Sequence, residues 1–134
     1  MLLGLGVSSI SDAGVAFAQN EKTLHDYYAA LDKGILPIKK GYFLDDEDVV
    51  FRRHILDISC NGSTCFTAEE LPLLRELCFP VLNELQEDGL ISFNESGCTI
   101  TSSGYSFIRN ICAAFDLHLL RNKAVTTIRF SNAV

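Results

Sequence analysis

Three arginines are the side chains of this chain best suited to bind an anionic ligand. Arg52 and Arg53 are adjacent in one stretch with helical periodicity, and Arg109 lies in another near the C-terminus. A guanidinium group can donate two parallel hydrogen bonds to a carboxylate, so each arginine is a candidate for carboxylate binding. Ion pairs between domains and at helix ends use arginine in the same way, and the sequence leaves both roles open.

The cysteines do not complete a known metal-binding motif. Cys60 and Cys65 have the spacing with which a plant-type iron–sulfur motif begins, but Ala68 stands where the third cysteine belongs. The chain has five cysteines, an odd number, and no export signal, which indicates reduced thiols in the cytoplasm. We therefore predict free thiols, no metal site and a cytoplasmic location.

The other ionisable residues form no catalytic constellation. His25, His54 and His118 are scattered, and we expect each at the surface or at a helix end. The acidic run Asp45–Asp48 could attract a cation, but carboxylates also stabilise the start of a helix, which is the interpretation that we favour. We predict no catalytic residue in this chain.

Composition and charge exclude several classes of protein. Of the 134 residues, 48% are hydrophobic and 21% are charged, which is typical of a folded globular protein. The formal net charge of −6 argues against binding to nucleic acid or to an anionic membrane surface. No apolar run approaches the ~20 residues that a membrane-spanning helix needs.

The N-terminal third predicts a fragment of an α/β protein. Leu2–Val7 is a continuous apolar run, typical of a strand buried on both faces of a parallel sheet. Ser8–Gly14 would follow its carboxyl end, where ligands bind in such sheets. We leave Val15–Asn20 unassigned, expect a helix over Lys22–Lys33, and interpret Ile35–Phe43 as an extended connector. Because nothing precedes the first strand, its sheet must be completed elsewhere.

The rest of the chain predicts helices around a β-hairpin. The expected elements are helices near residues 45–60, 67–78 and 80–88, a hairpin over 90–101, a helix over 105–120, and a tail in which Thr126–Phe130 could form a strand. This order is that of a winged-helix module. The helix at 80–88 carries acids and no Lys or Arg, so we do not expect it to bind DNA.

The expected fold class is therefore α+β, mainly α. Residues 1–40 would form the terminal strand–helix piece of an α/β barrel, incomplete here, and residues 41–134 would form a small winged-helix-like domain.

Segments spread over residues 2–120 resemble the C-terminal region of oxygen-independent coproporphyrinogen III oxidases. Leu3-Gly4-Leu5-Gly6-Val7-Ser8-Ser9-Ile10-Ser11 resembles the last barrel strand of these enzymes and its loop. The other matching segments are Ala18-Gln19-Asn20, Tyr27-Tyr28, Arg52-Arg53, Cys60-Asn61, Glu87-Asp88-Gly89-Leu90 and Ile108-Arg109-Asn110-Ile111. The chain departs from the family at Gly62–Cys65, where a longer insert is usual, and it lacks the family's Cys-x3-Cys-x2-Cys iron–sulfur motif.

The resemblance implies a function for a longer parent polypeptide. Enzymes of this family use radical S-adenosylmethionine chemistry to decarboxylate two propionates of coproporphyrinogen III oxidatively, which gives protoporphyrinogen IX in haem synthesis. The implied cofactors are S-adenosylmethionine and a 4Fe-4S cluster in the parent, with none bound to this chain alone. The implied partners are the N-terminal radical-SAM barrel of the same polypeptide and the porphyrinogen substrate.

The resemblance also assigns candidate site residues. Ile10 matches an isoleucine beside bound S-adenosylmethionine, where its contact would be apolar. Because the substrate carries four propionates, Arg52, Arg53 and Arg109 become candidates for substrate binding. The chain by itself would be inactive and would cap the substrate side.

Two alternatives remain open at this point. The chain could be a free-standing winged-helix interaction module or regulator, which predicts an N-terminal segment folded into its own body. It could also belong to a haem-chaperone relative of the oxidase, which binds porphyrin without oxidising it. The oxidase fragment instead predicts an exposed apolar surface near residues 2–17.

Overall fold

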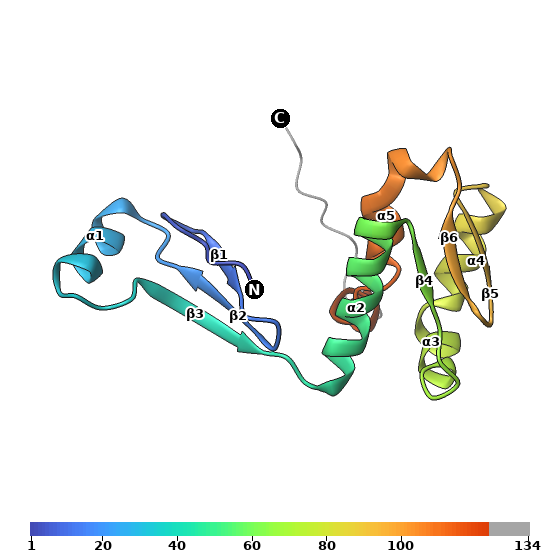
Figure 1. Ribbon diagram of the computed structural model, residues 1–134, viewed down its shortest axis with the longest axis horizontal. Helices are drawn as coiled ribbons and strands as arrows, with labels where there is room; N and C mark the ends of the chain where they lie inside the picture. Colours follow the sequence, from blue (N-terminus) through green and yellow to red (C-terminus); the bar gives the residue numbers. More distant parts are fainter. Residues whose placement is uncertain (124–134) are drawn as a thin grey trace. The chain divides into compact units, whose positions relative to one another are not determined.

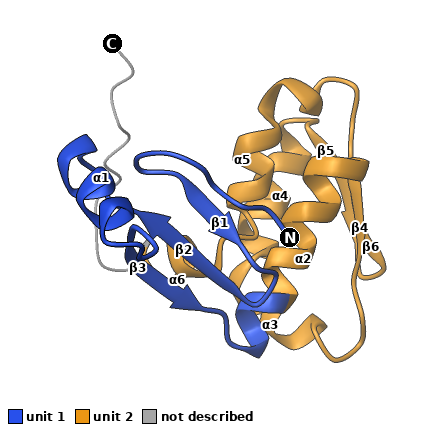
Figure 2. Cartoon of the chain, turned by 60° about the vertical axis from the view of Figure 1, so that its left-hand side comes forward, with its two compact units in different colours: residues 1–49 blue, residues 50–134 orange. Residues whose placement is uncertain are grey.

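The chain forms two compact units, residues 1–49 and residues 50–134 (Figure 2). The computed structural model describes residues 1–123 (Figure 1). The expected division near residue 40 falls inside a strand of the first unit. The expected strand at Thr126–Phe130 lies outside the described residues.

Unit 1 is an antiparallel three-stranded sheet with one helix. Strands β1 (Ile10–Asp12), β2 (Ala16–Asn20) and β3 (Ile38–Phe43) lie in the order β1-β2-β3, and helix α1 (Leu24–Asp32) connects β2 to β3. The turn between β1 and β2 is closed by the Asp12 carboxylate, which accepts the Gly14 N–H at 2.7 Å. Gly14 has a φ of +89°, a conformation that glycine adopts without steric cost.

The predicted strand at Leu2–Val7 is not formed in the described structure, whose first strand is β1, but the exposed apolar surface expected near residues 2–17 is present. Leu2 makes only an isolated antiparallel bridge to Asp12, and Leu3 and Leu5 are 74% and 79% exposed. The segments predicted as a loop and a connector contain β1 and β3, and the unassigned stretch forms β2. The link between β1 and β2 spans only residues 13–15, whereas a parallel pair needs a crossover of about a dozen residues or more. The helix predicted over Lys22–Lys33 is confirmed as α1.

No large aliphatic or aromatic side chain of unit 1 is buried. Its buried residues are Asn20, Pro37 and Asp48. Its exposed large apolar residues include Leu2, Leu3, Leu5, Ile10, Val15, Leu24, Tyr28, Leu31, Ile35, Leu36, Ile38, Tyr42 and Phe43. Unit 1 thus has regular hydrogen-bonded structure without a hydrophobic core of its own.

Unit 2 packs helices against a second three-stranded sheet. Its elements are α2 (Asp46–Asn61, which begins in unit 1), β4 (Ser63–Cys65), α3 (Leu71–Leu77), α4 (Phe79–Glu87), β5 (Ile91–Asn94), β6 (Gly97–Ile100), the 3-10 helix η1 (Gly104–Phe107), α5 (Ile108–Ala113) and α6 (Leu117–Lys123). The sheet order is β4-β6-β5, with antiparallel pairs. The fully buried side chains include Phe115, Ile58, Leu74, Leu82 and Ile111.

Most elements of unit 2 follow the sequence prediction. The hairpin is confirmed as β5 and β6, and the two helices near residues 67–78 and 80–88 are confirmed as α3 and α4. Pro72 and Pro80 each lie at the start of their helix, where a missing N–H costs no helical hydrogen bond. In the turn before α3 the Glu70 carboxylate accepts the Thr67 N–H at 3.0 Å.

Two predictions for unit 2 need correction. The single helix expected over residues 105–120 is divided into η1, α5 and α6. Strand β4 was missed, because its three residues are too few to give an alternating pattern. The chain is therefore a mixed α/β protein. Within residues 1–123, no helix combines the length and apolar character needed to span a bilayer.

Candidate functional site

The glycine-rich segment before Ile10 is held by side chains from β2 and α1. The Asn20 amide donates to the Gly4 and Gly6 carbonyls at 3.1 and 2.9 Å. The Gly6 N–H in turn donates to the Tyr27 hydroxyl at 3.1 Å. A Cβ on Gly4 would lie within 2.6 Å of the Ile10 carbonyl oxygen, so the close approach of these two backbones requires glycine. These contacts fix the glycine-rich segment that packs against the backbone of Ile10.

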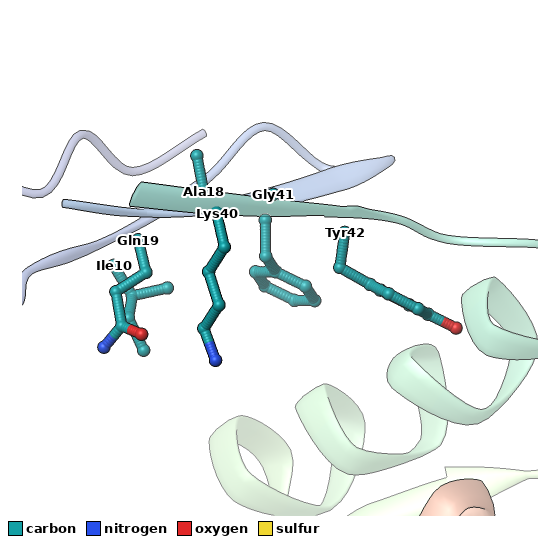
Figure 3. A pocket seen from close by; sticks show the side chains of 7 residues that line it. Ile10, Ala18, Gln19, Lys40, Gly41 and Tyr42 are labelled. Atoms are coloured by element: carbon teal, nitrogen blue, oxygen red, sulfur yellow. The ribbon is translucent and has the colours of Figure 1, made fainter. Parts of the chain in front are cut away.

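Ile10 lines a hollow of about 310 Å³ on one face of the unit 1 sheet (Figure 3). Ile10 is directly opposite Gln19, and Gln19 is directly opposite Lys40, so the three side chains form one row across the strands. Phe17 and Tyr42 form the next pair. Figure 3 shows Ile10, Gln19, Lys40 and Tyr42 on the same side of the sheet and Ala18 on the other. This face of the sheet therefore presents apolar side chains together with the ammonium group of Lys40 and the amide group of Gln19.

Tyr42 is fixed by the acidic run at the start of α2. Its hydroxyl donates to Asp48 Oδ2 at 2.6 Å, and Asp48 is 5% exposed. The hydrogen bond to Asp48, together with desolvation, raises the pKa of Tyr42 above its ordinary value. Asp45 and Asp48 cap α2 reciprocally, since the Asp48 N–H donates to Asp45 Oδ1 at 2.8 Å. The run is thus a helix start, as predicted.

Arg53 is committed to an ion pair within unit 2. Its Nη2 lies 2.7 Å from Glu70 Oε1, and its Nη1 donates to the Cys65 carbonyl at 3.4 Å. Burial of the Glu70 carboxyl opposes its ionisation, but the Thr67 N–H and the Arg53 guanidinium outweigh this effect and hold the pKa of Glu70 below its ordinary value. These contacts favour the structural alternative for Arg53 over carboxylate binding.

His54 is fully buried, contrary to the prediction of a surface or helix-end histidine. Its ring stacks on Phe115 with centroids 5.4 Å apart and meets Phe66 edge-on at 5.5 Å. Phe51 and Ile58, which lie three residues before and four after it on α2, are also buried. The missed signal was this spacing, which places His54 on the apolar stripe of the helix.

Hydrogen bonds assign the neutral tautomer of His54. Thr64 Oγ1 donates to Asp57 Oδ2 at 3.2 Å, so its oxygen accepts from His54 Nδ1 at 2.8 Å. His54 Nε2 then carries a lone pair, which faces Arg53 Nη2 at 3.3 Å. Burial, and secondarily the Arg53 charge, lowers the pKa of His54 to about 4. His54 is therefore a structural, uncharged group at neutral pH.

Arg109 lies on a second hollow, of about 320 Å³, within unit 2. The hollow is lined by Ile55 and Ser59 of α2 and by Ile108, Arg109, Cys112 and Asp116. Arg52 precedes Ile55 by three residues and Ser59 by seven, so it lies on the same side of α2 as this hollow. Of the three arginines, only Arg109 thus lines this hollow among the described residues, whereas Arg53 is directed to Glu70.

The described residues hold no metal site. Cys60, Cys65, Cys78, Cys98 and Cys112 are all free thiols. Burial raises the pKa values of Cys78 and Cys98 to about 12. No group of three or more His, Cys, Asp or Glu side chains is placed to bind a metal ion within residues 1–123.

No family model matches the chain. Its similar proteins and its similar solved structure are nevertheless all described as the same enzyme. The chain is 36% identical over 145 residues to the oxygen-independent coproporphyrinogen III oxidase of Synechocystis, covering 99% of this chain and 30% of that protein. It is 35% identical over 140 residues to the Pseudomonas aeruginosa oxidase of the same name, with the same coverage. The chain thus spans about 30% of the length of these relatives.

A solved structure supports the same relationship. Coproporphyrinogen III oxidase from Escherichia coli, described as a radical SAM enzyme, matches with a TM-score of 0.74 and 35% identity. The match covers 88% of this chain and 29% of that one. The chain is therefore homologous to one part of these oxidases along nearly its whole length, and the match is consistent with their C-terminal region.

Proposed function

We propose that this chain is the C-terminal region of an oxygen-independent coproporphyrinogen III oxidase and works only within the whole enzyme. That enzyme would convert coproporphyrinogen III to protoporphyrinogen IX by oxidative decarboxylation of two propionates. In this proposal, unit 1 completes the radical-SAM barrel, and unit 2 is a winged-helix-like domain that caps the substrate side. The five free thiols support a reducing, cytoplasmic location.

The observation that carries the proposal is the missing core of unit 1. Its helix α1 has no buried residue, and Leu24, Tyr28 and Leu31 lie exposed at helical spacing on one side. Apolar surface of this extent is normally covered by protein. The relatives are longer than this chain, and a further part of such a polypeptide would cover this surface. A free-standing regulator offers no explanation for this surface.

The cofactors belong to the whole enzyme and not to this chain. The described residues offer no set of ligands for an iron–sulfur cluster. S-adenosylmethionine would lie beside Ile10, whose side chain would give an apolar contact next to the fixed glycine segment. When bound to the cluster in the parent, it would supply the radical that takes a hydrogen atom from each propionate.

Two of the three arginines remain candidates for propionate binding. Arg109 is exposed at the hollow between α2 and α5, and Arg52 lies on the same side of α2. A guanidinium–carboxylate pair at a half-exposed site contributes about 1 kcal/mol, or roughly fivefold in affinity. Arg53 is assigned to the ion pair with Glu70.

The test is anaerobic turnover by the full-length protein. With S-adenosylmethionine, a reductant and an electron acceptor, we expect it to convert coproporphyrinogen III to protoporphyrinogen IX. We expect no turnover from a variant whose cluster cysteines are replaced. Arg109→Met should raise KM for coproporphyrinogen several-fold while the matched change Arg75→Met, at a surface ion pair with Glu95, leaves it unchanged. Stable haem binding without turnover would instead identify a haem-chaperone relative.

A further inference from the structure

The hollow on the unit 1 sheet has a charge that no described group neutralises. The Lys40 ammonium group has no hydrogen-bond or ion-pair partner among residues 1–123, although the residue lines the hollow together with Gln19 and Tyr42. The neighbouring Lys39 is the unpaired residue of a β-bulge, since Ile38 and Lys40 are opposite Asn20 and Gln19, and its Nζ lies 3.3 Å from Glu21 Oε2. The two adjacent lysines therefore have different environments.

The surroundings of Lys40 suit a ligand with a flat apolar body. Phe17 and Tyr42 are directly opposite each other on β2 and β3, and Ile10 completes the apolar surface on β1. The Tyr42 hydroxyl donates to Asp48, which fixes the orientation of the ring. Gln19 uses its amide N–H on the Ser8 carbonyl at 3.2 Å, which leaves its carbonyl oxygen as an acceptor.

This combination favours a small ligand over packed protein. Covering an unpaired ammonium with protein would remove its hydration without compensation, which costs several kcal/mol. A carboxylate carried on an apolar body would neutralise Lys40 and cover the aromatic pair at the same time. The exposed stripe of α1, by contrast, has no such charge among its apolar residues.

We propose that Lys40, with Ile10, Phe17 and Tyr42, forms a subsite for a carboxylate-bearing ligand in the assembled enzyme. The inference rests on the proposed function, which supplies two such ligands. One is the methionyl carboxylate of S-adenosylmethionine, which would contact Ile10. The other is a propionate of the porphyrinogen, whose pyrrole ring would lie on Phe17 and Tyr42. In either case the carboxylate of the ligand would form an ion pair with the Lys40 ammonium.

The experiment compares three variants of the full-length protein. Lys40→Met removes the charge and keeps the length, Lys40→Arg keeps the charge, and Lys39→Met is the matched control, because the Lys39 ammonium is already paired with Glu21. Affinity for S-adenosylmethionine is measured by equilibrium dialysis. Affinity for coproporphyrin III, which carries the same four propionates, is measured by fluorescence. We expect Lys40→Met to weaken one of them about tenfold, Lys40→Arg to retain most of it, and Lys39→Met to match the wild type.

The possible outcomes distinguish the two ligands from each other, and they test the Lys40 subsite separately from the proposed function. A loss confined to S-adenosylmethionine assigns the methionyl carboxylate, and a loss confined to coproporphyrin assigns a propionate. If Lys40→Met binds both ligands as Lys39→Met does while the wild type turns over, the subsite is refuted and the proposed function stands. If the wild type binds neither ligand and shows no turnover, the proposed function fails and this ligand class fails with it.

Discussion

The burial of His54 predicts that unit 2 loses stability in mildly acidic solution. The ordinary pKa of histidine, 6.5, applies to the unfolded chain, whereas in the folded protein the pKa of His54 is about 4. Between these values the unfolded state binds a proton that the folded state does not bind. The contribution of His54 is therefore complete above the unfolded pKa, and it is lost as the pH falls from 6.5 towards 4.

The size of the effect follows from the two pKa values. Lowering the pH from neutral to about 5 should reduce the free energy of unfolding by about 2 kcal/mol. At about pH 5 the His54 side chain is protonated in nearly all unfolded chains and in few folded ones. This is a large share of the total stability of a small domain. Glu70 adds a loss of the same sign only at lower pH, since its pKa is lowered from 4.5.

The assay is urea denaturation of the chain at about pH 7 and about pH 5, followed by the circular dichroism of its helices. The matched variant is His54→Gln, which cannot be protonated in this range. Gln loses the stacking on Phe115 and is less stable at both pH values, so only the difference between them is compared. We expect the wild type to lose about 2 kcal/mol more than the variant on acidification. Equal losses would refute the assignment of a buried neutral histidine.

Two further changes test contacts described above. Asn20→Asp is isosteric but replaces the donating amide by an oxygen that faces the Gly4 carbonyl, so amide hydrogen exchange of the N-terminal segment in the full-length protein should accelerate at least about tenfold. The same replacement at the exposed Asn83 should leave that exchange unchanged, and equal exchange in both variants would contradict the role of Asn20. Arg75→Met removes an exposed ion pair with Glu95 and should change the free energy of unfolding by less than about 1 kcal/mol in thermal denaturation.

Elements with a clear local signal were predictable from the sequence. Helix α1, the division between α3 and α4 at Pro80, and the β5–β6 hairpin all depend on periodicity, proline or turn residues that act over a few positions. The N-terminal run does not form the predicted strand in the described structure, and its exposed Leu3 and Leu5 agree with the apolar surface that the oxidase-fragment interpretation predicts near residues 2–17. A sequence records which residues avoid water, but not which other part of a polypeptide covers them.

The candidate site was predictable only in part. Ile10 could be named from a resemblance, and the structure adds the hollow on which it lies. Lys40 and Tyr42 were not singled out, because their role depends on the pairing of β2 with β3, which joins residues about twenty positions apart. Arg53 and His54 show the reverse limit, since their respective partners Glu70 and Thr64 follow or lie in strand β4, which the sequence pattern did not reveal.

The Thr64 hydroxyl has a consequence for the order in which unit 2 folds. It joins α2 to β4 through Asp57 and His54, which are seven and ten residues away, before β4 pairs with β6 more than thirty residues further along the chain. Short loops close with a small entropy loss, so this local pair is suited to form early, and the distant strand then adds to an existing edge. Thr64→Val should therefore slow refolding as well as lower stability. A change confined to the unfolding rate would place the α2–β4 contact after the transition state.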